Sequence, residues 1–153
     1  MPRRVQRYVT ELLVEILGPA EIEKRFEWCR GDSLQAGCRG RTLPFDAVWD
    51  SRKLIVEVDE RQHGEAVDHF DKPWKLTVSG VHRGEQRRLY DQRKGRHARR
   101  RGYKLIRLRV SILASKGRRI AHRDHDADRT AILELLREKG VQSGPLRKPP
   151  TRR

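Results

Sequence analysis

Three acidic residues stand out because they lie in segments that otherwise favour burial. Glu57 and Asp59 interrupt the apolar run 54–59, and Asp46 lies in the β-prone run 43–49 just before it. Burying a carboxylate is costly unless a partner compensates its charge. Residues two apart on a strand point to one face, and a cross-strand neighbour in a hairpin lies roughly 5 Å away. Three carboxylates that close repel one another, so the pattern predicts a divalent-cation site, with pairing to nearby arginines as the alternative.

A β-hairpin is predicted to position these acids. The two runs are separated by DSRK at residues 50–53, whose length and polar composition are typical of a tight connection. The second run is apolar apart from its two acids, as expected for a central strand buried on both faces. The segments predicted before the hairpin are an amphipathic helix over 5–17 that ends at Gly18-Pro19, a short strand over 25–29 and a mobile basic loop over 30–42.

The rest of the chain completes one α/β domain. We expect a single domain over residues 1–140, with a mixed central sheet of about four strands flanked by helices, and a disordered basic tail over 141–153. Asp128 is expected to cap the last helix. The remaining predicted segments are an irregular insertion over 64–84, a helix over 85–101 that ends at Gly102, a strand over 103–110, a loop over 114–127 and a helix over 128–139.

The charge of the chain indicates a polyanionic partner. Thirty-six Lys and Arg residues against 21 Asp and Glu residues give a formal net charge of +15 and a pI near 10.8. Arginine dominates the excess and binds phosphates in a bidentate manner, which favours nucleic acid over an acidic protein, while a merely solvated basic surface is the alternative. The helix over 87–101 is predicted to follow the phosphates of DNA through Arg87, Arg88, Arg93, Arg96, Arg99, Arg100 and Arg101.

Cysteine usage and hydropathy bear on location. Cys29 and Cys38 lack the paired spacing of a zinc knuckle, and no run of about 18 apolar residues is present. These features predict reduced thiols, no membrane association and a cytoplasmic, nucleoid-associated protein. Trp28, Trp49 and Trp74 are candidates for stacking on bases, although packing inside the protein is the favoured interpretation for each.

Two segments resemble a nuclease family. LPFDAVWDSRKLIVEVDERQH (residues 43–63) and YDQRKGRHARRRGYKLIRLRV (residues 90–110) resemble the very-short-patch-repair-like branch of the PD-(D/E)XK superfamily, which also includes EDxHD homing endonucleases. The shared pattern is a strand-terminal Asp, an E-x-D followed by a His, a helical D-x-x-K and a GY-hydrophobic-IR strand. In this chain the pattern falls, in order, on Asp46, Glu57 to Asp59, His63, Asp91 to Lys94 and residues 102–107.

The resemblance implies a restriction-endonuclease-like domain that hydrolyses phosphodiester bonds of duplex DNA with Mg²⁺ or Mn²⁺. It assigns Asp46 and Glu57 as metal ligands, and Asp59 as a further ligand or as the group that orients the attacking water. Asp59 stands where the superfamily usually has a Lys, which leaves the general base open between His63 and Gln62.

Two further residues receive roles from the resemblance. Lys94 would stabilise the charge that develops on the phosphate, although Asp91 and Lys94 also fit an ordinary pair on a helix surface. Glu11 lies in the first helix, where the family often has a helical Glu, although Arg7 four residues earlier already explains it as an ion pair.

Three functions remain open from the sequence. The first is a metal-dependent nuclease of the nicking, restriction, repair or homing type. The second is a non-catalytic nucleic-acid-binding module in which the acids only neutralise basic residues. The third is a nuclease-fold subunit that is active within a homodimer or a larger complex.

Overall fold

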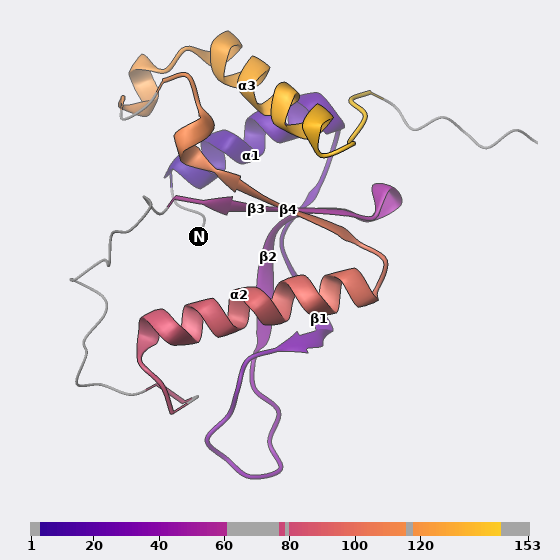
Figure 1. Cartoon of the computed structure of the whole chain (residues 1–153), viewed down its shortest axis with the longest axis vertical. Coiled ribbons are helices and arrows are strands. Elements are labelled where there is room, and N and C mark those ends of the chain that lie inside the picture. The colour runs from indigo at the N-terminus through magenta and orange to yellow at the C-terminus, as the bar shows by residue number, and fades with distance from the viewer. Residues whose placement is uncertain (1–3, 61–76, 79, 116–117, 145–153) are drawn as a thin grey trace, which may run out of the picture.

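The computed structural model describes residues 4–60, 77–78, 80–115 and 118–144. Its strands form one mixed sheet in the order β1-β2-β3-β4, in which only β3 and β4 are parallel. Helices α1 and α3 lie on one side of the sheet and α2 lies on the other (Figure 1). The predicted α/β class and the mixed sheet of about four strands flanked by helices are confirmed. The elements are α1 (Arg4–Leu17), β1 (Glu21–Arg30), β2 (Thr42–Trp49), β3 (Leu54–Asp59), α2 (Arg83–Arg100), β4 (Lys104–Arg109) and α3 (His125–Glu138).

The predicted hairpin is confirmed in β2 and β3. A single 3-10 turn over Asp50–Arg52 joins the strands, and Lys53 takes a left-handed conformation (φ 49°) that completes the reversal. Trp49 then pairs with Leu54. The backbone N–H of Lys104 donates to the carbonyl of Lys53 at 2.8 Å, which sets β4 beside β3. Strand β3 therefore lies between two neighbours, which explains its nearly continuous apolar sequence.

Two apolar clusters hold the layers together. Alternate side chains of β3 enter different clusters, so that Val56 packs with α1 and α3 whereas Ile55 packs with α2. The first cluster includes Leu12 and Leu13 of α1 and Ile132 of α3, all at most 1% exposed. The second cluster is smaller because α2 is rich in arginine, and it rests on Phe45, Val48, Ala98 and Tyr103.

Strand β1 is longer than predicted. It begins at Glu21 rather than at residue 25, and its first three residues are exposed. Their one apolar side chain, Ile22, is 43% exposed, so no buried apolar pattern marks these residues as part of a strand.

The cap of the last helix was assigned to the wrong aspartate. Helix α3 begins at His125, and the Asp124 carboxylate accepts a hydrogen bond from the N–H of Ala127 at 3.0 Å. Asp128 is instead fully buried and accepts hydrogen bonds from the Tyr8 hydroxyl at 2.7 Å and the Ser115 N–H at 3.0 Å. Asp128 therefore ties α3 to α1 and to the segment after β4.

The predicted boundaries of the insertion and the tail also shift. Residues 83–84, assigned to the insertion, belong to α2, and most of the insertion lies outside the described residues. The first residues of the predicted tail belong to the domain, because Val141 packs against the core and Arg52 donates to the carbonyl of Gln142 at 3.0 Å. Residues 145–153 lie outside the described part. Among the described helices, none is both long and apolar enough to cross a bilayer.

Candidate functional site

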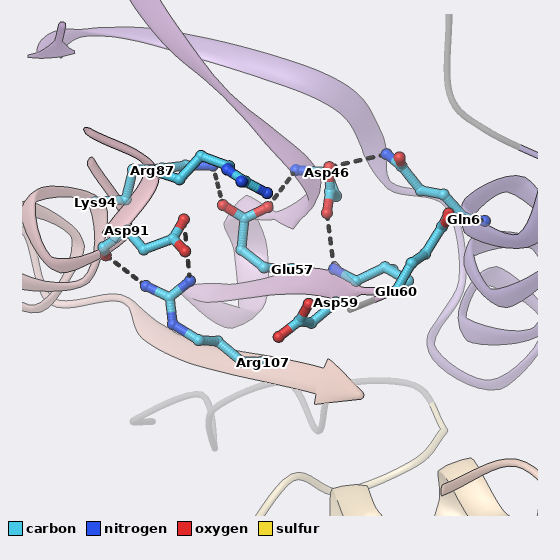
Figure 2. Close-up of a pocket in the computed structure, with 10 residues that line it drawn as sticks. Gln6, Asp46, Glu57, Asp59, Glu60, Arg87, Asp91, Lys94 and Arg107 are labelled. Atoms are coloured by element: carbon cyan, nitrogen blue, oxygen red, sulfur yellow. Dashed lines mark hydrogen bonds and ion pairs between the residues drawn. The ribbon is translucent and has the colours of Figure 1, made fainter. Parts of the chain in front are cut away.

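A pocket of about 260 Å³ opens where β2 and β3 separate (Figure 2). The regular pairing of these strands reaches Ala47 and Val56 and stops there. Beyond this point the Asp46 carboxylate accepts a hydrogen bond from the N–H of Val58 at 2.7 Å, where a strand carbonyl would otherwise have been the acceptor. The pocket is lined by Gln6, Asp46, Glu57, Val58, Asp59, Glu60, Arg87, Asp91, Lys94 and Arg107.

Asp46 and Glu57 meet in this pocket, as predicted from their positions in the hairpin. The N–H of Asp46 donates to Oε2 of Glu57 at 3.1 Å. The second Asp46 oxygen accepts a hydrogen bond from Nε2 of Gln6 on α1 at 2.8 Å. Glu57 is only 6% exposed, so its carboxylate lies close to that of Asp46 with little water to screen the charges.

The electrostatic cost of this arrangement appears in the pKa of Asp46. Burial, as the larger cause, and the neighbouring negative charge of Glu57 together raise the pKa of this carboxyl from 3.8 to about 7. The Val58 N–H and the Lys94 ammonium act in the opposite sense without cancelling the rise. Two carboxylates in one partly dry pocket therefore hold a proton near neutral pH unless a cation takes its place.

Lys94 of α2 supplies a positive charge to the same pocket. Its ammonium forms an ion pair with Oε1 of Glu57, and the side chain is 13% exposed. The ammonium also lies 4.9 Å from the centre of the Phe45 ring. Lys94 thus reaches the carboxylate pair from the helix, as the resemblance implied.

Asp91, one turn before Lys94, connects the helix to β4. Its carboxylate lies 3.7 Å from the guanidinium of Arg107, and Arg107 also donates to the Asp91 carbonyl. The D-x-x-K segment and the GY-hydrophobic-IR strand are therefore in contact. Since both residues reach the sheet, a pair confined to the helix surface does not describe them.

Asp59 lines the pocket but does not join the other two acids in a cluster. In Figure 2 its carboxylate points away from that of Asp46. In the part of the chain that the structure describes, no three His, Cys, Asp or Glu side chains lie together as a metal-binding group. Of the three acids expected to gather around one ion, Asp46 and Glu57 lie together and Asp59 does not, and the ion itself stays a prediction.

Glu11 is not brought to this pocket. It is exposed on α1 and lines a separate depression with Arg7, Thr10 and Ile22. Five residues separate Glu11 from Gln6, which is about 140° around a helix, so the two side chains cannot face the same pocket. His63 and Gln62, the candidates for the general base, lie outside the described residues.

The seven arginines assigned to DNA are distributed around α2 and its end. Arg87 faces the pocket, and Arg93 forms an ion pair with Asp32 at 2.9 Å. The guanidinium of Arg101 lies 5.7 Å from the Trp28 ring. The exposed members are Arg88, Arg96, Arg99, Arg100 and Arg101.

The tryptophans follow the packing interpretation where they are described. Trp49 is 3% exposed and donates to the carbonyl of Gly18 at 2.9 Å. Trp28 is half-buried and stacks on Phe26 with 4.5 Å between ring centres. Trp74 lies outside the described residues.

Sequence reasoning missed Gln6 of α1 and its partner Glu60, which both line the pocket. Gln6 donates to Asp46 through its side chain, and its backbone N–H donates to the Glu60 carboxylate at 3.2 Å. A polar residue in the first turn of an amphipathic helix has no pattern that distinguishes it from a solvated one. The contact spans 40 residues and becomes visible only when α1 is placed on the sheet.

Comparison of the chain with protein-family models, with curated proteins and with solved structures finds no match.

Proposed function

We propose that the protein is a metal-dependent endonuclease that hydrolyses phosphodiester bonds of duplex DNA. The observation that carries the proposal is the meeting of Asp46 and Glu57 in one pocket with the ammonium of Lys94. Arg87 and Arg107 line the same pocket and add positive charge near the acids. Such a pocket suits an anionic substrate that brings a cation with it.

Asp46 and Glu57 would hold the metal ion, Mg²⁺ or Mn²⁺. Oε1 of Glu57 contacts the Lys94 ammonium, and each other oxygen of the pair accepts one hydrogen bond among those described. A carboxylate oxygen has two lone pairs, so each retains one for a cation. Mg²⁺ commonly uses one or two carboxylates and takes its remaining ligands from water and phosphate, so a third acid is not required. A bound ion would polarise the scissile phosphate and lower the pKa of an attacking water.

The side chains around the acids have separate tasks in this proposal. Lys94 would stabilise negative charge on the phosphate, because its ammonium is already held in the pocket. Gln6 and the Val58 N–H hold the Asp46 carboxylate in one orientation before the substrate arrives. Asp59 would orient water at the rim of the pocket, and His63 or Gln62 remains the proposed source of proton transfer.

The rest of the molecule supports DNA as the substrate. A net charge of +15 favours binding to a polyanion, and five exposed arginines lie on α2. The mixed sheet between helices is compatible with a restriction-endonuclease-like domain.

A second function, nucleic-acid binding without cleavage, is favoured by one observation. Lys94 already neutralises Glu57 through an ion pair, so this acid has a partner without a metal. In that case the pocket would be a structural ion pair beside a basic surface, and chelators would leave binding to DNA unchanged.

Cleavage of supercoiled plasmid tests the proposal. We expect nicking with Mg²⁺ or Mn²⁺, none with chelator, and loss of nicking in Asp46→Asn and Glu57→Gln, while gel-shift affinity for DNA is retained. Glu11→Gln is the matched control, because this acid is exposed and lies outside the pocket. Binding without cutting would favour the second function, and cutting that requires an added partner would indicate a subunit of a larger complex.

A further inference from the structure

The loop between β1 and β2 is a structured projection, which we call the arm (residues 31–41). Figure 1 shows it extending past the ends of both strands. Its two ends are joined by a hydrogen bond from the N–H of Gly31 to the carbonyl of Arg41 at 2.9 Å. A Cβ on Gly40 would lie 1.9 Å from the Gly31 carbonyl oxygen, so the close approach at this neck requires glycine. The sequence predicted a mobile basic loop here, whereas the base of the arm is closed.

Helix α2 fixes the arm at its base. The Tyr90 hydroxyl accepts a hydrogen bond from the N–H of Asp32 at 2.9 Å. Arg93 forms an ion pair with the Asp32 carboxylate at 2.9 Å and donates to the carbonyl of Arg30 at 2.9 Å. The arm therefore has a fixed direction relative to the helix that carries Lys94.

The outer part of the arm combines an exposed apolar side chain with positive charge. Leu34 is 79% exposed, the highest value among the large apolar residues of the described chain. Residues 33–41 contain Arg39 and Arg41 and no acid, and both arginines are exposed. A single exposed leucine is ordinary on a protein surface, but here it stands on an anchored, basic projection.

We propose that the arm enters a groove of duplex DNA and inserts Leu34 between neighbouring base pairs. This inference rests on the proposed function in so far as duplex DNA is the substrate. Apolar side chains such as leucine act as wedges that unstack a base step, and arginines beside them bind the flanking phosphates. Insertion removes the Leu34 side chain from water, which compensates part of the cost of unstacking.

The position of the arm agrees with this role. The chain leaves the arm at Thr42 and reaches Asp46 four residues later along β2. Four strand residues span about 13 Å, which is about four base-pair steps of DNA. The base of the arm would thus lie about four base-pair steps from the bond held at the pocket, and Leu34, further out on the arm, would unstack a step beyond that point.

Fluorescence of 2-aminopurine tests the insertion directly. The probe is a short duplex rich in TA steps, which unstack easily, with 2-aminopurine in place of single adenines and chelator present to prevent cutting. We expect the full chain to raise the fluorescence on binding. Leu34→Ala should remove this rise while it weakens binding by about tenfold, and Leu34→Phe should restore the rise.

Two comparisons make the test specific. Ile22→Ala removes another exposed apolar side chain, at 43% exposure on β1, and should behave as the wild type does. Leu34→Ala should leave the salt dependence of binding unchanged, whereas Arg39→Ala and Arg41→Ala should each lower its slope by about one. Equal fluorescence with Leu34→Ala and the wild type would overturn the proposal, as would DNA binding by the wild type without any rise.

The outcomes separate this inference from the nuclease proposal. A chain that cuts plasmid with Mg²⁺ but never raises 2-aminopurine fluorescence is a nuclease without a wedge. A chain that raises the fluorescence through Leu34 but never cuts has the wedge without the nuclease.

Cys38, which is exposed on the arm while Cys29 is buried, offers a second readout. Disulfide trapping of Cys38 by DNA that carries a thiol tether should succeed near the unstacked step and fail elsewhere.

Discussion

Replacement of Asp46 by asparagine should make the metal-free protein more stable at alkaline pH. The folded protein holds a proton on this carboxyl up to a pKa of about 7, whereas the unfolded chain releases it near 3.8. Between these values the folded state binds more protons, so the contribution of Asp46 to stability falls as pH rises and is fully unfavourable above 7. Asparagine cannot ionise, so the variant loses this dependence. Its carboxamide can still accept from Val58, provided that the Gln6 amide turns to accept from it.

The size of the effect follows from the two pKa values. Each tenfold change in proton affinity corresponds to about 1.4 kcal/mol, so a rise from 3.8 to about 7 corresponds to about 4 kcal/mol. The pocket is open to solvent, which screens the charges, and we therefore expect about half of this value, or about 2 kcal/mol. The variant and the wild type should have nearly equal stability well below pH 3.8, where the side chain is neutral in both the folded and the unfolded state, and the difference should grow as pH rises toward 7.

Urea unfolding in chelator, followed by circular dichroism from about pH 5 to about pH 8, measures this difference. Glu11→Gln is the control, because Glu11 is exposed and lies outside the pocket. A difference for Asp46→Asn that stays constant across this range, or that turns against the variant at high pH, would refute the burial argument. Adding Mg²⁺ at about pH 8 should stabilise the wild type and leave the variant nearly unchanged.

Three further predictions concern other variants. Lys94→Met should lower the free energy of unfolding by about 3 kcal/mol, because Glu57 loses its ion-pair partner in a buried position. Adding Glu57→Gln to the same chain should restore most of this loss, which urea unfolding of a double-mutant cycle would measure. Asp124→Ala should lower the free energy of unfolding by about 1 kcal/mol, because α3 loses its N-cap. Asp128→Ala should lower it by more than about 2 kcal/mol, because two hydrogen bonds to a buried carboxylate are lost. Equal losses in thermal melts would contradict the assignment of Asp124 as the cap. Gln6→Leu should raise the Mg²⁺ concentration for half-maximal plasmid nicking about fivefold, because the hydrogen bond that orients the Asp46 carboxylate, worth about 1 kcal/mol, is lost. An unchanged Mg²⁺ titration would show that Gln6 does not contribute to the site.

The parts of the fold that the sequence could predict are those with a local physical signature. Glu57 was identifiable because an acid in a buried strand is costly, and Asp46 because a four-residue connection places it across the hairpin from Glu57. The helix with Lys94 and the strand with Arg107 could be located from their own patterns. Their contact with the hairpin was implied by a resemblance and not by the residues themselves.

The parts that could not be predicted depend on packing between distant segments. Gln6 reaches Asp46 only because α1 lies across the end of the hairpin. Asp124 and Asp128 are chemically equivalent as candidate helix caps. Only the folded structure distinguishes them, because Asp128 is buried beside Tyr8 and therefore does not cap the helix. The arm was interpreted as mobile because glycine and serine are abundant in it, whereas Gly31 and Gly40 in fact allow its two ends to touch.

The early end of the β2–β3 pairing has a consequence for how the protein responds to its substrate. Although β2 and β3 do not pair there, Glu57 pairs with Arg107 of β4, and Phe45, next to Asp46, pairs with Lys24 of β1. The spacing of the two acids is therefore determined by strands and not by a loop that must close. The acidic pair is then the stationary part of the molecule during binding. If the proposed function holds, adaptation falls on the DNA, which must deform to bring a phosphate into the fork between the two strands.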